Sequence, residues 1–196
     1  MSECGRLLLK TKENFLIVRY LILTALVLSL SVAAFAQKTP TFAGYRAKVE
    51  KVRNVKVNVA SGQARMFRTN LRAAAKGGVN FAGHYILTGW GCGTNCAQMA
   101  VIDARTGRAY FPRELEGVGI GYCDLPAGDV ATDAPAENDM LSGAFFKPNS
   151  RLLVFQGFKG GDLNKTHSKC GNNYWEWTGS SLRQVAFKPG KSTATP

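Results

Sequence analysis

The sequence predicts a mainly β protein with an α+β character given by one helix. Antiparallel hairpins are expected to form a single small sheet, sandwich or barrel-like domain, with one N-terminal helix packed on it. Three observations support this prediction. Beyond residue 80, short apolar runs alternate with turn sequences rich in Gly, Pro and Asn. Only one earlier segment has the apolar spacing of a helix. The 21 Gly among 196 residues favour turns and short strands over long helices.

The first 36 residues are expected to be a signal peptide. Basic residues precede an uncharged run over 20–36, which ends in Ala34-Phe35-Ala36 with small residues at the cleavage positions. Cleavage before Gln37 would leave a periplasmic or secreted protein. The alternative is a retained membrane anchor, because the run lies near the lower length limit of a spanning helix.

The N-terminal part of the expected mature chain is predicted to be a leader followed by strands. Residues 37–44 are expected to form a flexible leader into a single domain over 45–188. Residues 45–60 alternate in patches and predict two short strands, with a bulge or break near Lys51-Val52. The residues expected on one face of the first strand are Tyr45, Ala47 and Val49.

A helix is expected over residues 62–76. Ser61 can cap its N-terminus, and Gly77-Gly78 is a typical end signal. The apolar side chains expected on its inner side are Met66, Phe67, Leu71 and Ala74.

Hairpins are expected over residues 81–187. The predicted strands cover 81–90, 98–104, 108–111, 142–147, 151–158, 173–177 and 182–187. The sequence DARTG at 103–107 is typical of a hairpin turn, with Gly107 placed for a positive φ. The segment 113–141 is expected to be irregular, and 189–196 to be a disordered tail.

Four cysteines follow the expected cleavage site, and an even number in an exported chain predicts two disulfides. Three pairings are open, and we favour Cys92–Cys96 with Cys123–Cys170. The first bond would close a tight turn between two strands. The second would close a long loop, which contributes about 4 kcal/mol in the chain-entropy model.

The positive charge is concentrated near the N-terminus of the expected mature chain. Residues 38–76 have ten Lys or Arg and one acid, Glu50, whereas 77–196 have eleven Lys or Arg and ten acids. Four cations fall within about 80° of one another on the predicted helix. This basic ridge consists of Arg65, Arg68, Arg72 and Lys76. It predicts a docking surface for an anionic partner, and the alternative is an ordinary solvated helix face.

The segment 80–96, NFAGHYILTGWGCGTNC, contains the largest number of reactive side chains. It includes the motifs F-x-G-H-Y from Phe81 and W-G-C-G-x-x-C from Trp90, and D-x-x-T-G follows from Asp103. These motifs resemble an uncharacterised family of small exported bacterial proteins. The resemblance implies a compartment, but it implies no mechanism, because no activity is established for that family.

The main interpretation of this segment is a hairpin loop clamped by a disulfide. Three alternatives are a Cys92 nucleophile activated by His84, a metal site that adds Cys96 and His167, and a redox-active dithiol. We expect no catalytic residue, no metal and no cofactor. The residues expected to contact a ligand are His84, Tyr85, Trp90, Gly91, Gly93, Thr94 and Asn95.

The expected function is that of an exported, disulfide-stapled binding protein without enzymatic activity. Its partner would be an anionic envelope component, or a protein bound as a small inhibitor binds its target. Nucleic acid is not expected as a partner, and a membrane is expected only through a retained N-terminal anchor. The first alternative is an exported hydrolase that uses His84, His167 and an acid such as Asp162. The second alternative is a structural envelope protein.

Overall fold

The computed structural model describes residues 39–60, 62–94, 96–119, 123–124, 141, 143–160 and 169–192. These residues belong to one compact unit that covers Thr39–Pro196. The expected signal peptide lies outside the described residues, as do Asn95, Asp162 and His167.

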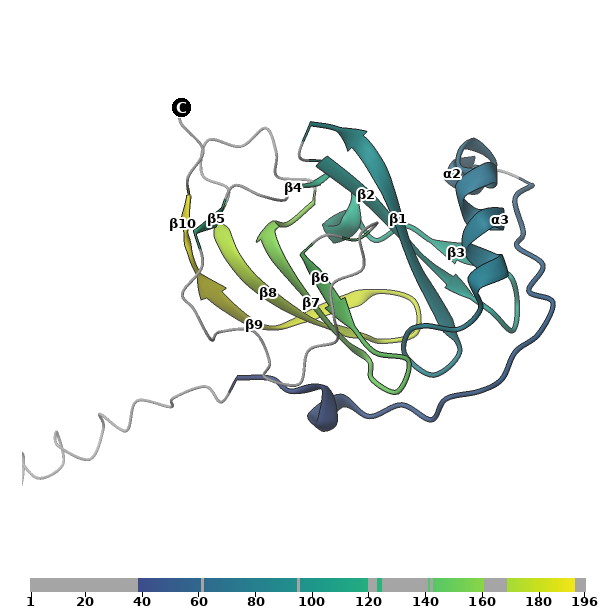
Figure 1. The fold of residues 1–196 in the computed structure, drawn as a ribbon, viewed down its shortest axis with the longest axis horizontal. Helices are drawn as coiled ribbons and strands as arrows, with labels where there is room; N and C mark the ends of the chain where they lie inside the picture. The colour runs from purple at the N-terminus through teal and green to yellow at the C-terminus, as the bar shows by residue number, and fades with distance from the viewer. Residues whose placement is uncertain are drawn as a thin grey trace, which may run out of the picture. The chain divides into compact units, whose positions relative to one another are not determined.

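Antiparallel strands form the main sheet, which has eight strands in the described part of the chain (Figure 1). These strands are β1 (Tyr85–Gly93), β2 (Cys96–Asp103), β3 (Ala109–Tyr110), β4 (Val118–Gly119), β6 (Ala144–Phe146), β7 (Leu152–Phe158), β8 (Cys170–Trp177) and β9 (Leu182–Pro189). Their order is β1-β2-β4-β7-β8-β9, with β3 beside β2 and β6 beside β7. The sheet is not closed into a barrel, and the predicted mainly β fold is confirmed.

The helical elements are short, and most lie before the sheet in sequence. They are η1 (Phe42–Tyr45), α2 (Gly62–Met66), α3 (Arg68–Gly77) and η2 (Arg113–Leu115). The helix expected over 62–76 is therefore divided at Phe67. Helical hydrogen bonds nevertheless continue through the division, from Phe67 N to Gln63 O and from Leu71 N to Phe67 O, each 3.0 Å. No helix among the described residues is long and apolar enough to cross a membrane.

Alternation along the strands divides the apolar side chains between two faces of the sheet. On β1, Tyr85 and Leu87 belong to the largest buried cluster, together with Leu153 of β7 and Trp177 of β8. Ile86 points to the opposite face, where it packs with Leu71 of α3. Helices α2 and α3 therefore cover the outer face of β1 and β2.

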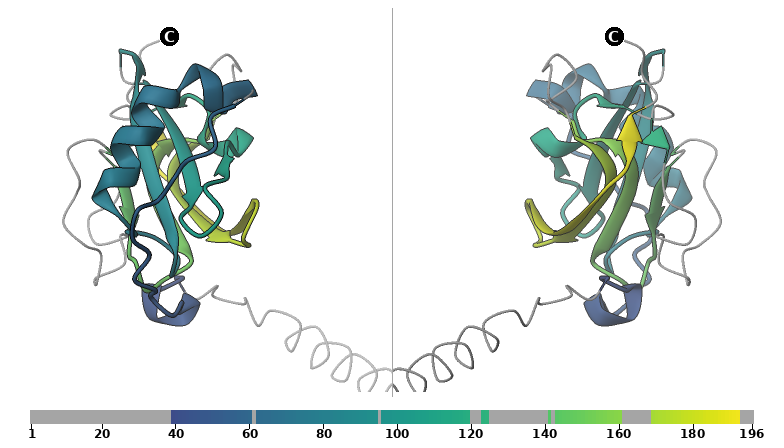
Figure 2. Two further views of the ribbon diagram at one scale, coloured as in Figure 1. Left: turned by 90° about the vertical axis from the view of Figure 1, so that its right-hand side faces the viewer. Right: turned by 90° about the vertical axis from the view of Figure 1, so that its left-hand side faces the viewer.

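The two strands expected within 45–60 are absent, and this prediction is wrong. Residues 46–60, which we name the strap, form an extended segment that contributes no strand to the sheet. The strap lies beside α2 and α3 on the outer face of β1 and β2 (Figures 1 and 2). Its half-buried valines pack on that face, namely Val52, Val55, Val57 and Val59. The apolar alternation arises because one side of the strap packs on the sheet, and not because the strap pairs with a neighbouring strand.

The strap is attached to the sheet at separate points. Ala47 N donates to Asn149 O, Glu50 N to Gly83 O, and Asn58 N to Gly107 O, each 2.8 Å. A strand ladder needs regularly repeated bonds along one neighbour, and these three acceptors lie in three different turns. The break in alternation also lies elsewhere than expected, because Val49 is 46% exposed and Asn54 has a φ of 55°.

Two further boundaries differ from the prediction. The strand expected from residue 81 begins at Tyr85, because Ala82 and Gly83 have positive φ values of 45° and 91° in the preceding turn. The tail expected over 189–196 is in part ordered. Pro189 ends β9, and β10 (Lys191–Ser192) pairs with β5 (Cys123–Asp124) in a separate two-stranded sheet.

Ser150 fixes η1, which directly precedes the strap, to the turn before β7. Its hydroxyl is completely buried and lies 2.9 Å from Phe42 O and 3.1 Å from Tyr45 O. The backbone strengthens this attachment, because Arg151 N donates to Tyr45 O at 2.7 Å. Segments more than 100 residues apart in sequence are therefore joined beneath η1.

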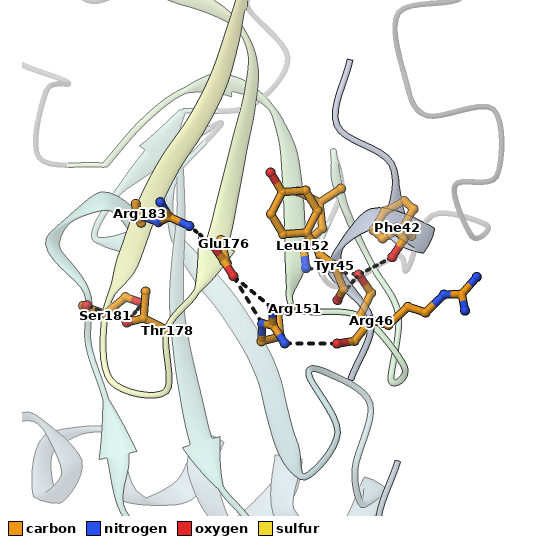
Figure 3. A network of polar contacts seen from close by, with 10 residues as sticks. Phe42, Tyr45, Arg46, Arg151, Leu152, Glu176, Thr178, Ser181 and Arg183 are labelled. Carbon is orange, nitrogen blue, oxygen red and sulfur yellow. Dashed lines mark hydrogen bonds and ion pairs between the residues drawn. The ribbon is translucent and has the colours of Figure 1, made fainter. Parts of the chain in front are cut away.

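An ion-pair network continues from this point across the sheet (Figure 3). Arg151 donates to Arg46 O at 3.0 Å and to Glu176 Oε1 at 3.1 Å. Arg183 of β9 binds the other oxygen of the same carboxylate. Hydrogen bonding from Arg183 and, to a smaller extent, from Arg151 lowers the pKa of Glu176, although burial acts in the opposite direction.

Candidate functional site: a basic layer on the sheet

The predicted disulfide between Cys92 and Cys96 is present at the tip of the β1–β2 hairpin. A register shift between Gly91 and Gly93 marks a bulge there, and Gly93 has a φ of 140°. Residues 91–94 are exposed, so the tip is an accessible and clamped loop. Because Cys92 and Cys96 are bonded to each other, neither is a free thiolate for the nucleophile or metal alternatives.

The second predicted disulfide, Cys123–Cys170, stays a prediction. Cys170 is disulfide-bonded, but the side chain of Cys123 lies outside the described residues. The backbone brings the two positions close together. Cys123 pairs with Ser192, and the preceding Lys191 places its carbonyl oxygen 3.5 Å from Cys170 Sγ.

Tyr85 and Trp90, both expected to contact a ligand, do not lie on one shared surface. They are five residues apart on one strand, so they point to opposite faces of the sheet. Tyr85 is only 8% exposed, and its hydroxyl donates to Gly179 O at 3.2 Å. Trp90 is half-buried under the helical side, where its ring lies 4.7 Å from that of Phe67. Their separation by an odd number of residues on one strand is the feature of the sequence that predicts opposite faces.

Tyr85 is integrated into the interior by its ring as well as by its hydroxyl. It makes an edge contact with the indole of Trp177 at 5.4 Å between ring centroids. Burial raises the pKa of the Tyr85 phenol, and the nearby carboxylate of Asp103 raises it further. The phenol is therefore a structural donor within this cluster.

His84 lies beside a carboxylate, but that carboxylate already has a structural role. Its Nε2 is 3.8 Å from Asp103 Oδ1, and its ring lies 4.2 Å from that of Tyr85. Asp103 Oδ1 accepts from Arg105 N at 2.9 Å, and Oδ2 accepts from the Thr106 hydroxyl at 2.9 Å. The carboxylate thus organises the turn into β3. The partners that the hydrolase alternative requires, Asp162 and His167, lie outside the described residues.

Two glycines of the motif segment allow the strap to approach the sheet. A Cβ on Gly83 would lie 2.6 Å from Lys48 O, and one on Gly107 would lie 1.9 Å from Lys56 O. Both residues also have positive φ values, 91° and 75°. The G of F-x-G-H-Y and the G of D-x-x-T-G therefore serve the same purpose, since each leaves room for a strap carbonyl.

An ion pair between Glu50 and Arg105 joins the strap to the turn before β3. Arg105 Nε donates to Glu50 Oε2 at 2.8 Å, and the second guanidinium nitrogen binds Glu50 Oε1. The hydrogen bond from Arg105 lowers the pKa of Glu50, and the same bond raises that of Arg105. The only carboxylate of the strap is therefore neutralised by a cation from the sheet.

The strap, α2 and α3 together form what we name the basic layer (Figure 2). Its exposed cations are Arg46, Lys48, Lys51, Arg53, Lys56, Arg65, Arg68, Arg72 and Lys76. None of them lies within ion-pair distance of a carboxylate in the part of the chain that the structure describes. Residues 62–77 contain no Asp or Glu at all. The predicted ridge of four cations is exposed, and the strap adds cations that were not assigned to a site from the sequence.

Met66 was expected on the inner side of the helix, and this expectation is wrong. Its side chain is 70% exposed, whereas Phe67 packs inward against Trp90 and Phe111. A helical wheel contained the signal, because Met66 lies about 140° from the buried Leu71. Sequence reasoning therefore missed an exposed apolar side chain beside the cations of the layer.

Two hollows border the strap. One has a volume of about 410 Å³ and is lined by Phe42, Ala43, Arg46, Ala47, Lys147 and Asn149. The other has a volume of about 240 Å³ and is lined by Asn58, Gln63, Ala64, Arg108, Ala109 and Phe111. Neither hollow includes His84, so the geometry of these two hollows gives no support to catalysis by that residue.

No protein family, no curated protein and no solved structure matches the chain. The resemblance of the three motifs to a family of exported proteins therefore stays a prediction.

Proposed function

We propose that this chain is an exported binding protein without enzymatic activity, which docks onto an anionic partner through the basic layer. The observation that carries the proposal is the set of exposed cations on the strap, α2 and α3, none of which has a carboxylate partner among the described residues. A solvated surface normally mixes both signs of charge. Apart from Glu50, which is paired with Arg105, the charged side chains of the layer are all positive, so the layer attracts anions before contact is made.

The attachment of the strap supports the proposal because it presents the cations in a fixed arrangement. Bonds at Asn149, Gly83 and Gly107 hold the strap, and its valines are packed on the sheet. A preorganised surface loses less conformational entropy on binding than a mobile tail does. Export is supported by the signal-like N-terminus and by the disulfide Cys92–Cys96, a bond typical of oxidising compartments.

The proposal is tested with heparin, a sulfated polyanion, as the probe. We expect Arg68→Gln/Arg72→Gln to elute from immobilised heparin at clearly lower salt than the wild type, because two cations that attract the polyanion are lost. The matched control is Lys169→Gln/Lys191→Gln, which removes the same charge from exposed positions on the β8 and β10 side. Equal elution of the two variants would contradict the proposal, because it would show that only net charge matters.

A further inference from the structure

The large apolar side chains that are exposed in the described part of the chain both belong to the basic layer. They are Met66 at 70% and Val49 at 46%. Met66 is the last residue of α2, at the division between α2 and α3. A single exposed apolar side chain is common on protein surfaces, but Met66 adjoins exposed arginines that have no carboxylate partner among the described residues.

The outward side of the helical segment has two distinct stripes. Arg65, Arg72 and Lys76 lie within about 40° of one another, and Met66 lies about 100° from Arg65 on the solvent side. Thr69 and Ala73, both exposed, occupy the surface between them. The exposed side of the helix thus combines a cationic stripe with an adjoining stripe of small and apolar side chains.

The residue after Met66 fixes the position of the methionine. Phe67 packs against Trp90 at 4.7 Å and against Phe111 at 6.1 Å between ring centroids. Its backbone also continues the helical hydrogen bonds through Gln63 and Leu71. Met66 is therefore held outward by a half-buried neighbour that packs on the sheet, and its exposure does not depend on fraying of a helix end.

We propose that the anionic partner is a lipid bilayer surface. Arg65, Arg72 and Lys76 would bind lipid phosphates, and Met66 would enter the boundary between headgroups and acyl chains. This inference rests on the proposed function and names the partner of the same surface. A soluble polyanion offers no apolar phase to a methionine, whereas an interfacial surface combines basic and apolar contacts. Such a contact is peripheral and differs from the N-terminal anchor considered from the sequence.

The test measures cosedimentation of the chain from Gln37 onward with lipid vesicles. This form contains the whole compact unit Thr39–Pro196 and lacks the apolar run 20–36, which would bind vesicles by itself. The vesicles contain phosphatidylcholine with or without phosphatidylglycerol, at low and at high salt. We expect binding only to vesicles with phosphatidylglycerol, and a steep loss of binding as salt increases.

Met66 distinguishes the bilayer from a soluble polyanion. We expect Met66→Ser to weaken vesicle binding about tenfold, because the buried apolar contact is lost. Elution from heparin should not change. Met66→Leu should bind as the wild type does, and so should the control Val49→Ser, which changes the other exposed apolar side chain.

The outcomes separate this inference from the proposed function. Unchanged vesicle binding of Met66→Ser, equal binding to neutral vesicles, or heparin binding without vesicle binding would each overturn the lipid inference. In those cases the proposed function stands if Arg68→Gln/Arg72→Gln still elutes early from heparin. Failure of that variant to differ from Lys169→Gln/Lys191→Gln would overturn both.

Discussion

At the scale of single residues, glycines decide how the strap meets the sheet. Gly107 has a φ of 75°, and its missing side chain leaves room for Lys56 O. Its own carbonyl oxygen accepts the hydrogen bond from Asn58 N. Gly107, the last residue of the D-x-x-T-G motif, therefore has three roles: it adopts the positive φ, it leaves room for the strap, and it accepts a hydrogen bond from the strap.

We predict that Gly107→Ala destabilises the protein by at least about 1–2 kcal/mol. The positive φ alone costs an alanine about that amount, and the new methyl group would overlap the strap carbonyl. The measurement is urea-induced unfolding. The matched control is Gly91→Ala, where a Cβ meets nothing within 4 Å. The control should stay within about 0.5 kcal/mol of the wild type. Equal unfolding midpoints for the two variants would contradict this role of Gly107.

At the scale of elements, the Glu176 network connects β8, β9 and the start of the strap. The carboxylate accepts from Arg151 and from Arg183, and its side chain is 11% exposed. Its pKa is lowered chiefly by the hydrogen bond from Arg183. The ionised form therefore stabilises the folded state above the ordinary glutamate pKa of about 4.3. This contribution is lost as the pH falls through the lowered pKa of the folded state.

We predict that Glu176→Gln lowers the free energy of unfolding by about 1–3 kcal/mol at neutral pH, as expected for hydrogen bonds to a charged group. The difference from the wild type should shrink when the pH falls below about 4. Urea unfolding at neutral and acidic pH provides the comparison. The control is Glu114→Gln, since Glu114 has no ion pair to a described residue. A difference that is the same at both pH values would rule out a charge-dependent role for Glu176.

Local sequence patterns were sufficient for the helix and for most hairpins. The end of α3 at Gly77, the hairpin tip between β1 and β2 and the strands β7 to β9 lie close to their expected positions. These elements depend on neighbours in sequence. The strap was misassigned because its tie points lie in turns distant in sequence, and apolar alternation alone does not distinguish packing on a sheet from pairing within it.

The candidate site was predicted only in part. The basic ridge followed from helical spacing, and its four cations are exposed. Tyr85 and Trp90 are close in sequence, but strand geometry places them on opposite faces of the sheet. Met66 is apolar, but its position on the helix directs it to solvent. In both cases the residue type does not determine the direction of the side chain.

At the scale of the whole molecule, the charge is divided between two parts of the described chain. The strap, α2 and α3 expose cations that have no carboxylate partner among the described residues, and the one acid of this layer, Glu50, is paired with Arg105. On the sheet, Glu176 is paired with Arg151 and Arg183. A one-sided charge distribution of this kind orients a protein as it approaches an anionic surface. The field would be weakened by salt, with a screening length of about 8 Å at physiological ionic strength.

The central claim, that the basic layer is the docking surface, is tested most directly by lysine acetylation followed by mass spectrometry. Saturating heparin should slow acetylation of the layer lysines, which are Lys48, Lys51, Lys56 and Lys76. It should leave Lys169 and Lys191 unchanged, because these exposed lysines lie on the β8 and β10 side. Equal protection of all these lysines, or protection confined to Lys169 and Lys191, would contradict the claim.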